Sequence, residues 1–366
     1  MSAPPSVDAP ARRIHVLHIV TGEMFSRFGR MFRELGLALT DLGGHITFLT
    51  DSERAREQLD ITPLEARATP SLSGWRSWGL GRALTREFGR CDVAHLWGAA
   101  GLAVVRPWAQ REEIPLLLHA TSEHEAETIT KRGLRAGDHV AGMCDAHCDR
   151  FHVRWPTLGQ SGAIHALPPA LLPPPEVRDV SPRGRTLGLV WRGRFEPGCG
   201  LELMVHALSR LAERHIDAQL VTIGQGPAPD IWALARRLQV SGRISLVGDP
   251  GIWDRALEGA DVFLATRRET TVSLAGMLAM SLGRIVIATG DALPEWYVDG
   301  ETALCVDPQP GAIAEAIRRI AEGDPNLLAL GRSAARYVRD MYSLPKLAER
   351  LMDTYAAMCG WGEGSQ

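Results

Sequence analysis

The stretch from Ala260 to Pro308 constrains the fold of this chain more than any other segment. It reads as a short apolar strand over 261–266, a charged loop, an apolar helix, a second strand over 284–289, a loop with Pro294-Glu295, and a third strand. Apolar strands of this length separated by a helix are typical of a parallel sheet that is covered on both faces. The stretch therefore predicts an α/β fold.

The helix inside this stretch begins near residues 271–273. Its first backbone N–H groups have no partner within the helix, and they point out of the edge of the sheet. Such a helix start is a ready site for an anion such as the diphosphate of a sugar nucleotide. The loop that carries Arg267, Arg268 and Glu269 lies where such a ligand would enter.

The same alternation of short apolar strands and helical segments runs through most of the chain. It begins with strands at 14–20 and 45–50 and a helix near 28–42, and it resumes after a proline-rich stretch at 165–185. We therefore expect two halves joined by a linker, each with a parallel sheet. Ligands of such folds bind beyond the carboxyl ends of the strands, so a cleft between the halves is the expected site.

Composition restricts the class of protein further. The chain has 366 residues, is 45% hydrophobic and 23% charged, and carries a formal net charge of -3. Its length favours two domains over one core, and its charge supplies no basic field for nucleic acid. The six cysteines form no paired framework, which is typical of a reducing cytoplasm. No segment is long and apolar enough to span a membrane.

Several ordered segments of residues 187–342 resemble the retaining glycosyltransferases of family 4. GRFEPGCGLELMVHAL at 193–208 is similar to a loop that opens a helix in that family, and IGQGP, RISLVG and ADVFLA follow in the family's order. HVLHIVTGEM, DVAHLWG and IPLLLHATSEHE in the N-terminal half are weaker matches. The resemblance implies an α/β GT-B fold, with two Rossmann-like parallel-sheet domains that face each other across a cleft.

This organisation predicts the domain boundaries. Residues 1–12 form a disordered tail, 13–170 an N-terminal acceptor domain, 171–185 a Pro-rich linker, 186–344 a C-terminal donor domain, and 345–366 a helix that returns toward the N-terminal domain, with a tail. Neither a P-loop nor a GxGxxG that opens a helix occurs. A nicotinamide oxidoreductase therefore has support at the level of the fold only.

The donor side of the site is assigned from the resemblance. Arg194 would bind the donor phosphates, because a guanidinium group matches phosphate oxygens. Glu269 would contact the sugar hydroxyls as a catalytic residue. The other donor-binding candidates are Gly22, Arg267, Arg268, Thr270, Thr271 and Ser273.

Two histidines, His119 and His95, are further catalytic candidates. The family commonly presents a histidine near the transferring sugar at the position of Thr121, and His119 lies two residues earlier on the same face of the strand. His95 belongs to a segment that resembles the family's His-x-His-Gly, in which Trp97 replaces the second histidine. A core or capping role is the alternative for both histidines.

Three positions depart from the family's pattern. Cys199 stands where the family has a lysine on the donor phosphates, and Thr121 stands at the histidine position. The glutamate that holds the ribose falls on Leu278, or on Met277 when counted from Glu269. Two functions therefore stay open. One is a metal-independent, retaining glycosyltransferase that uses a nucleotide-sugar and an unidentified acceptor; the other is a catalytically inactive GT-B-like binding or partner protein.

The predicted partners are a UDP- or GDP-sugar as donor and a lipid-linked compound or a small metabolite as acceptor, with no nucleic acid and no cofactor. The expected location is the cytoplasm, with peripheral contact at the inner face of the membrane through residues 75–90. Arg82, Arg86 and Arg90 would form a basic stripe beside an apolar one on a helix there. A sheet-covering helix with a solvated arginine face is the alternative.

One cluster has spacings typical of metal ligands on a helix. A single cluster without a second pair is weak evidence for zinc, so we predict no metal site. The cluster consists of Cys144, His147, Cys148 and His152.

Overall fold

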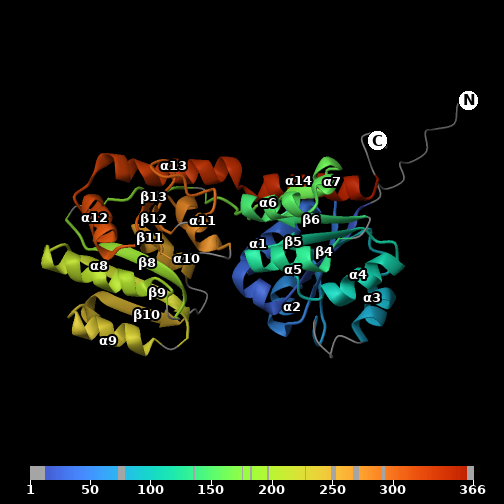
Figure 1. Ribbon diagram of the computed structural model, residues 1–366, viewed down its shortest axis with the longest axis horizontal. Coiled ribbons are helices and arrows are strands. Elements are labelled where there is room, and N and C mark those ends of the chain that lie inside the picture. Colours follow the sequence, from blue (N-terminus) through green and yellow to red (C-terminus); the bar gives the residue numbers. More distant parts are fainter. Residues whose placement is uncertain are drawn as a thin grey trace, which may run out of the picture. The chain divides into compact units, whose positions relative to one another are not determined.

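The chain forms two compact units in a computed structural model (Figure 1). Unit 1 is Met1–Pro169 with Leu344–Gln366, and unit 2 is Ala170–Ser343. The structure describes residues 13–72, 79–134, 137–174, 176–181, 184–195, 198–226, 228–248, 253–266, 272–290 and 293–360. Within these ranges each unit has one sheet, and all strand pairs in both sheets are parallel. The predicted class of two Rossmann-like parallel-sheet domains is confirmed.

The described part of unit 1 contains a seven-stranded sheet in the order β3-β2-β1-β4-β5-β6-β7. Its strands are β1 His15–Val20, β2 His45–Thr50, β3 Glu65–Ala68, β4 Val93–Trp97, β5 Leu116–Ala120, β6 Asp138–Gly142 and β7 Ile164–Ala166. Its helices are α1 Gly22–Asp41, α2 Glu53–Leu59, α3 Leu80–Phe88, α4 Leu102–Arg111, α5 Glu123–Arg132, α6 Asp145–Arg154, α7 Pro156–Gln160 and α14 Leu344–Met358. The strand order reverses direction between β1 and β4.

The described part of unit 2 contains a six-stranded sheet in the order β10-β9-β8-β11-β12-β13, and its order reverses between β8 and β11. Its strands are β8 Leu187–Arg194, β9 Ala218–Gln225, β10 Ile244–Gly248, β11 Val262–Ala265, β12 Ile285–Thr289 and β13 Leu304–Val306. Its helices are α8 Leu201–Glu213, α9 Pro229–Arg237, α10 Trp253–Gly259, α11 Leu274–Ser281, α12 Pro310–Ala321 and α13 Pro325–Met341, with a short 3-10 turn at Ser241–Arg243.

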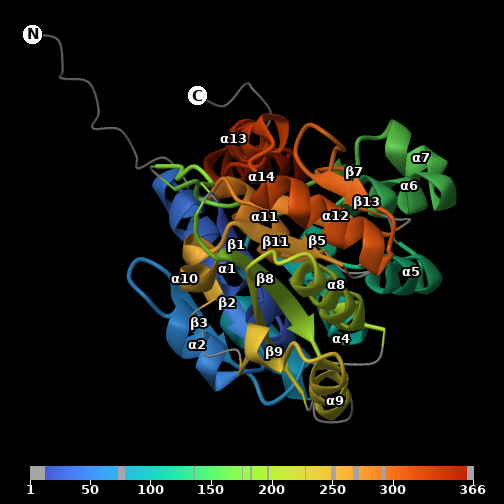
Figure 2. The same ribbon diagram turned by 90° about the vertical axis from the view of Figure 1, so that its left-hand side faces the viewer.

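Successive side chains of a strand point to opposite faces of the sheet, so the buried residues of unit 2 form a core on each face. Leu189 and Trp191 of β8 point to one face and pack with residues of α8, α9 and α12. Helices α8 and α9 lie side by side on this face (Figure 2). Helix α11 covers β11 and β12 on the other face, and α13 packs against it.

Helix α1 begins at Gly22, several residues before the predicted start near residue 28. The reason is a side-chain cap, because the Thr21 hydroxyl accepts a hydrogen bond from Met24 N at 3.0 Å. The longer helix brings Met24 and Phe25, both buried, into the core of unit 1.

Helix α3 covers one face of the sheet in unit 1. Its Leu80, Leu84 and Phe88 are buried in the core that this face shares with α4 and α5, while Arg82 and Arg86 are exposed. The apolar stripe is therefore already used in packing, which supports the sheet-covering interpretation over membrane docking. The aromatic residues Trp75 and Trp78 of that prediction lie outside the described residues.

The segment that leads into unit 2 is held by charged groups at the amino ends of the strands. Arg185 forms an ion pair with Asp261, which is 1% exposed and also accepts from Gly188 N at 2.9 Å. Arg284, 4% exposed, donates to the carbonyl groups of Arg178 and Ala260 at 2.7 and 2.8 Å. Because Asp261 and Arg284 are buried, loss of their partners would be costly, although Arg185 itself is exposed.

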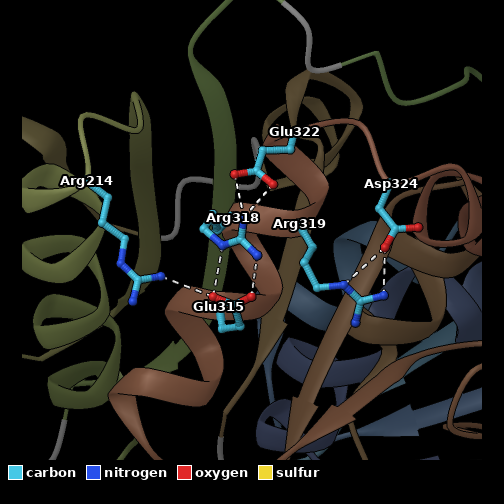
Figure 3. A network of polar contacts seen from close by, with 6 residues as sticks. All are labelled: Arg214, Glu315, Arg318, Arg319, Glu322 and Asp324. Carbon is cyan, nitrogen blue, oxygen red and sulfur yellow. Dashed lines mark hydrogen bonds and ion pairs between the residues drawn. The ribbon is translucent and has the colours of Figure 1, made fainter.

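A surface network joins the end of α8 to α12 (Figure 3). Glu315 accepts from Arg214 at 3.1 Å and from Arg318 at 2.9 Å, and Arg318 also pairs with Glu322. The pKa of Glu315 is lowered to about 2, first by the hydrogen bond from Arg318. All of these side chains are at least partly exposed, so the network contributes little to stability.

The last helix of the chain, α14, completes the second face of the sheet in unit 1 by packing on α1. Its Tyr355 is fully buried, and the Tyr355 hydroxyl lies 2.6 Å from Nδ1 of His95, which is 260 positions earlier in the chain. This hydrogen bond ties the end of the chain to a central strand of the sheet.

We predict that Tyr355→Phe destabilises the protein, because it leaves Nδ1 of His95 buried without a donor. The expected loss in free energy of unfolding is about 1 to 3 kcal/mol, measured by chemical denaturation. Tyr337→Phe is the matched control, since Tyr337 is only half-buried and its hydroxyl has no hydrogen-bond partner among the described residues. Equal stability of the two variants would contradict the role given to Tyr355.

Candidate functional site

The strand-order reversal of unit 2 lies between β8 and β11, and Arg194 is the last residue of β8. Ligands of open parallel sheets bind in the crevice beyond the carboxyl ends of the strands at such a reversal. Arg194 is exposed, and no residue in the described ranges forms a hydrogen bond or ion pair with its side chain. Its guanidinium group is therefore available at the position where an anionic ligand is expected.

The start of α8 packs closely against the end of β11. Gly200 has a φ of 85°, and a Cβ on it would lie only 2.4 Å from the carbonyl oxygen of Thr266. Thr266 in turn accepts a hydrogen bond from the Trp191 indole at 3.1 Å. These contacts bring the amino end of α8, which has no side-chain cap, to the crevice beside Arg194.

Two of the three departures from the family pattern are buried apolar side chains here. Cys199 is 2% exposed and belongs to the core of unit 2, and Leu278 is 3% exposed on α11. Met277, the other position considered for the second glutamate, is fully buried. Neither family position therefore presents a charged group to a ligand in this chain.

The predicted loop between β11 and α11 lies mostly outside the described residues. These are the candidates Arg267, Arg268, Glu269, Thr270 and Thr271. Ser273 is described, and its hydroxyl caps α11 by accepting from Ala275 N at 3.3 Å. Its assignment to donor binding stays a prediction.

A cavity of about 420 Å³ lies at the carboxyl ends of β9 and β10 in unit 2. The Phe195 ring on its wall is stacked on Trp191, with the ring centroids 6.0 Å apart. This size suits one small organic group. The lining residues are Phe195, Gly224, Gly226, Ala228, Trp232, Leu246, Val247 and Gly248.

Gly22 lies at the corresponding reversal in unit 1, two positions after the end of β1. Its N–H donates to Oδ1 of Asp51 at 2.7 Å, and a Cβ on it would lie 2.7 Å from Cβ of Ser52. A carboxylate therefore already stands at the amino end of α1, where an anion would otherwise bind. The donor contact assigned to Gly22 stays a prediction that this geometry does not support.

His95 and His119 lie inside the core of unit 1, and neither has an exposed atom. The strands end in Trp97 and Ala120, and helices α1 and α14 cover this face, so the catalytic role assigned to both histidines stays a prediction that this geometry does not support. The arrangement therefore matches the alternative core role.

The ring nitrogens of both histidines are used in a buried chain of hydrogen bonds. His119 Nε2 lies 3.1 Å from the Leu167 carbonyl, so it carries the proton and Nδ1 accepts from His95 Nε2 at 3.2 Å. His95 Nδ1 then accepts from the Tyr355 hydroxyl. His18 beside them accepts from the Trp97 indole at 3.0 Å. Burial lowers the pKa of His119 and of His18 to about 3, and it lowers that of His95 well below the ordinary value.

Thr121, the third departure, is fully buried just after β5. Its hydroxyl and its backbone N–H both donate to Oε2 of Glu125, at 2.6 and 2.8 Å. Ser122 caps the same helix by accepting from Glu125 N at 3.3 Å. Thr121 thus holds a carboxylate where the family presents an imidazole.

The cluster with metal-like spacings makes contacts with the backbone. His147 Nδ1 lies 3.2 Å from the Ala120 carbonyl, and the Cys148 thiol lies 3.5 Å from the carbonyl of His165. Within the described ranges, no three His, Cys, Asp or Glu side chains are placed to hold one metal ion.

Sequence reasoning missed Phe195, Trp232 and Glu125. The first two come from a loop and a helix that meet only in the folded sheet, so no sequence spacing connects them. Glu125 did leave a signal, because a serine followed three residues later by glutamate is a helix-capping pattern.

The second unit matches the family described as Glycosyl transferases group 1 over residues 186–323. The chain is 30% identical over 197 residues to a phosphatidyl-myo-inositol mannosyltransferase of Mycobacterium tuberculosis, an overlap of 50% of each chain. The chain thus spans about half the length of the relatives that it matches.

Two solved structures share the whole fold at low identity. A glycosyltransferase from Rickettsia africae has a TM-score of 0.76 at 15% identity, over 96% of this chain and all of that one. HepE from Anabaena, in complex with UDP and glucose, has a TM-score of 0.74 at 13% identity, over 94% of this chain and 100% of its own. These likenesses establish the GT-B fold.

The family match lies within unit 2, and the relatives and the solved structures make the chain similar to GT-B glycosyltransferases. The predicted resemblance to family 4 fits these mannosyltransferase relatives. Within the described ranges, no helix is both long and apolar enough to cross a bilayer.

The buried histidines predict a stability that falls in mild acid. Below a pH of about 6.5 the unfolded chain binds protons that folded His18, His95 and His119 do not. The contribution of these neutral histidines to the free energy of unfolding is complete above that pH. It is lost as the pH falls toward 3, at up to about 1.4 kcal/mol per pH unit for each histidine.

Chemical denaturation at a series of pH values measures this slope. His119→Gln is expected to flatten it, because one buried neutral imidazole is removed, and His124→Gln is the exposed control on the adjacent helix. A free energy of unfolding that stays constant across this pH range would show that the three imidazoles are not held neutral.

Proposed function

We propose that this chain transfers a sugar from a nucleotide-sugar to a hydroxyl group of an acceptor, with unit 2 binding the donor and unit 1 the acceptor. The observation that supports this most is the position of Arg194. It stands exposed and unpaired among the described residues at the strand-order reversal of unit 2, beside a cavity of nucleobase size. The diphosphate would contact Arg194 while the base enters the cavity.

The cavity has the features that a planar base requires. Phe195 and Trp232 offer aromatic faces for stacking, and three glycines leave backbone groups open to the edge of the base. Phe195 directly follows Arg194 in the chain, so the phosphate contact and the base contact are neighbours. A UDP- or GDP-sugar is the donor class that we propose.

Transfer develops negative charge on the leaving diphosphate, and the main task of the protein is to stabilise that charge. Arg194 and the uncapped amino end of α8 would do so without a metal ion. We propose Arg267, Arg268 and Glu269 as further donor contacts and retention of configuration as the outcome, both from the resemblance to family 4.

A second function is favoured by one specific observation. Cys199 and Leu278 are buried and apolar where the family has a lysine and a glutamate. A chain that binds a nucleotide-sugar without turning it over would then serve as a binding or partner protein. Donor binding without transfer or hydrolysis of the sugar would select this function.

We predict that isothermal titration calorimetry detects binding of UDP, GDP or their glucose and mannose conjugates. Arg194→Ala is expected to weaken that binding at least about tenfold, because a charged hydrogen bond to phosphate is lost. Arg237→Ala, an exposed arginine on α9, is the control that should bind as the wild type does. Absence of binding by all of these nucleotides in folded protein would contradict the proposal.

Because Leu278 has an apolar side chain, we predict that the protein discriminates only weakly between ribose and 2′-deoxyribose nucleotides. A site that hydrogen-bonds a hydroxyl group rejects the analogue that lacks it, whereas an apolar contact does not. The 2′-deoxy form of the nucleoside diphosphate that binds should therefore bind within about threefold of the ribose form. Leu278→Glu is expected to increase the preference for ribose, and a strong ribose preference in the wild type would mean that another residue holds the ribose.

A further inference from the structure

The strand-order reversal of unit 1 lies between β1 and β4, and it places Gly98 and Met24 at one crevice. Gly98 directly follows β4 with a φ of 86°, and Met24 lies in the first turn of α1. The crevice at such a reversal is where an open parallel sheet binds its ligand. If unit 1 binds the acceptor, as in the proposed function, this crevice is the place for it.

The carboxylate of Glu125 lies over this crevice. A Cβ on Gly98 would be 2.6 Å from Oε1 of Glu125 and 3.1 Å from Cε of Met24, so Oε1 occupies the space above a glycine that has no side chain. Only a residue without a Cβ allows the carboxylate to approach so closely.

The two oxygens of this carboxylate have different surroundings. Oε2 accepts two hydrogen bonds from the fully buried Thr121, which fix its position. Oε1 accepts no hydrogen bond from the part of the chain that the structure describes, and it is not sealed from water. One oxygen is thus held rigidly while the other remains an acceptor for a ligand hydroxyl.

The charge of this edge restricts what kind of ligand it accepts. The three residues that follow each of the seven described strands of unit 1 include no lysine or arginine, and Arg350, which donates to the last carbonyl group of β7, stands three strands from β4 in the sheet order. Like charges in such a crevice would repel a phosphate group. The acidic residues among these positions are Glu23, Asp51, Glu53, Glu123 and Asp145.

We propose that Glu125 binds a hydroxyl group of the acceptor through Oε1, and that the acceptor is a polyhydroxyl compound that carries no phosphate near the reacting hydroxyl. This inference rests on the proposed function. Thr121 is a positioning residue in it, because it acts only through Glu125.

The test compares Glu125→Gln with the wild type in a transfer assay. The donors are radiolabelled UDP-glucose and GDP-mannose. The acceptors are myo-inositol and methyl mannoside, each paired with its phosphate monoester. Glu127→Gln is the control, since Glu127 lies on the same helix, has a half-exposed side chain and pairs with Lys131 at 2.7 Å. Donor dissociation constants and melting temperatures are measured for all three proteins.

The wild type is expected to have a KM at least about tenfold lower for an unphosphorylated acceptor than for its phosphate ester. Glu125→Gln should raise the KM for the unphosphorylated acceptor about tenfold and narrow the difference within each pair, with the donor dissociation constant unchanged. If Glu125 only capped α5, the variant would lower the melting temperature and leave the ratio within each pair unchanged.

Three results would overturn the inference. They are a wild-type preference for the phosphorylated acceptors, an unchanged ratio in Glu125→Gln, and the absence of transfer to either unphosphorylated acceptor by protein that binds its donor. Failure to bind either donor is a separate result, because it refutes the proposed function itself and with it the acceptor site.

Discussion

Parallel pairing of every described strand is the constraint on which the rest of this structure depends. Each strand must be followed by a crossover before the next parallel strand begins, so the carboxyl ends of all strands in a unit meet at one edge. The order of strands reverses once in each sheet, and a crevice opens at that point. Arg194 in unit 2 and Gly98 in unit 1 lie at these crevices, which explains why loops far apart in the chain contribute to the candidate site of each unit.

The two crevices differ in charge, and the difference suits two kinds of ligand. The crevice of unit 2 has an exposed arginine and an uncapped helix end, which favour a diphosphate. The crevice of unit 1 has the Asp51 carboxylate bound to the first N–H of α1 and the Glu125 carboxylate over Gly98. The positive crevice of unit 2 would attract the negatively charged diphosphate of a donor. The acidic crevice of unit 1 would accept a neutral acceptor without repelling it.

The fold could be predicted from the sequence because each strand and helix is recognisable from its own short segment of residues. Apolar strands such as Ile285–Thr289 are recognisable by composition, and the helices between them by length. The start of α1 was missed because the Thr21 cap is a single side-chain contact. Arg194 was assigned from the resemblance to family 4, and the structure places it at the last position of β8.

The environment of the histidines could not be predicted in the same way. Period-two alternation shows which face of a strand His95 occupies, but it does not show what covers that face. The cover is Tyr355 and its helix, which arrive from 260 positions away in the chain. The cavity wall and the carboxylate over Gly98 also depend on non-local contacts, and therefore only the structure reveals them.

The central claim is that unit 2 binds a nucleoside diphosphate at its strand-order reversal. A crystal structure of the protein with bound UDP or GDP tests it most directly. We expect phosphate oxygens within hydrogen-bond distance of the Arg194 guanidinium group and the base between Phe195 and Trp232. A nucleotide bound elsewhere, with the cavity empty and Arg194 turned to solvent, would contradict it.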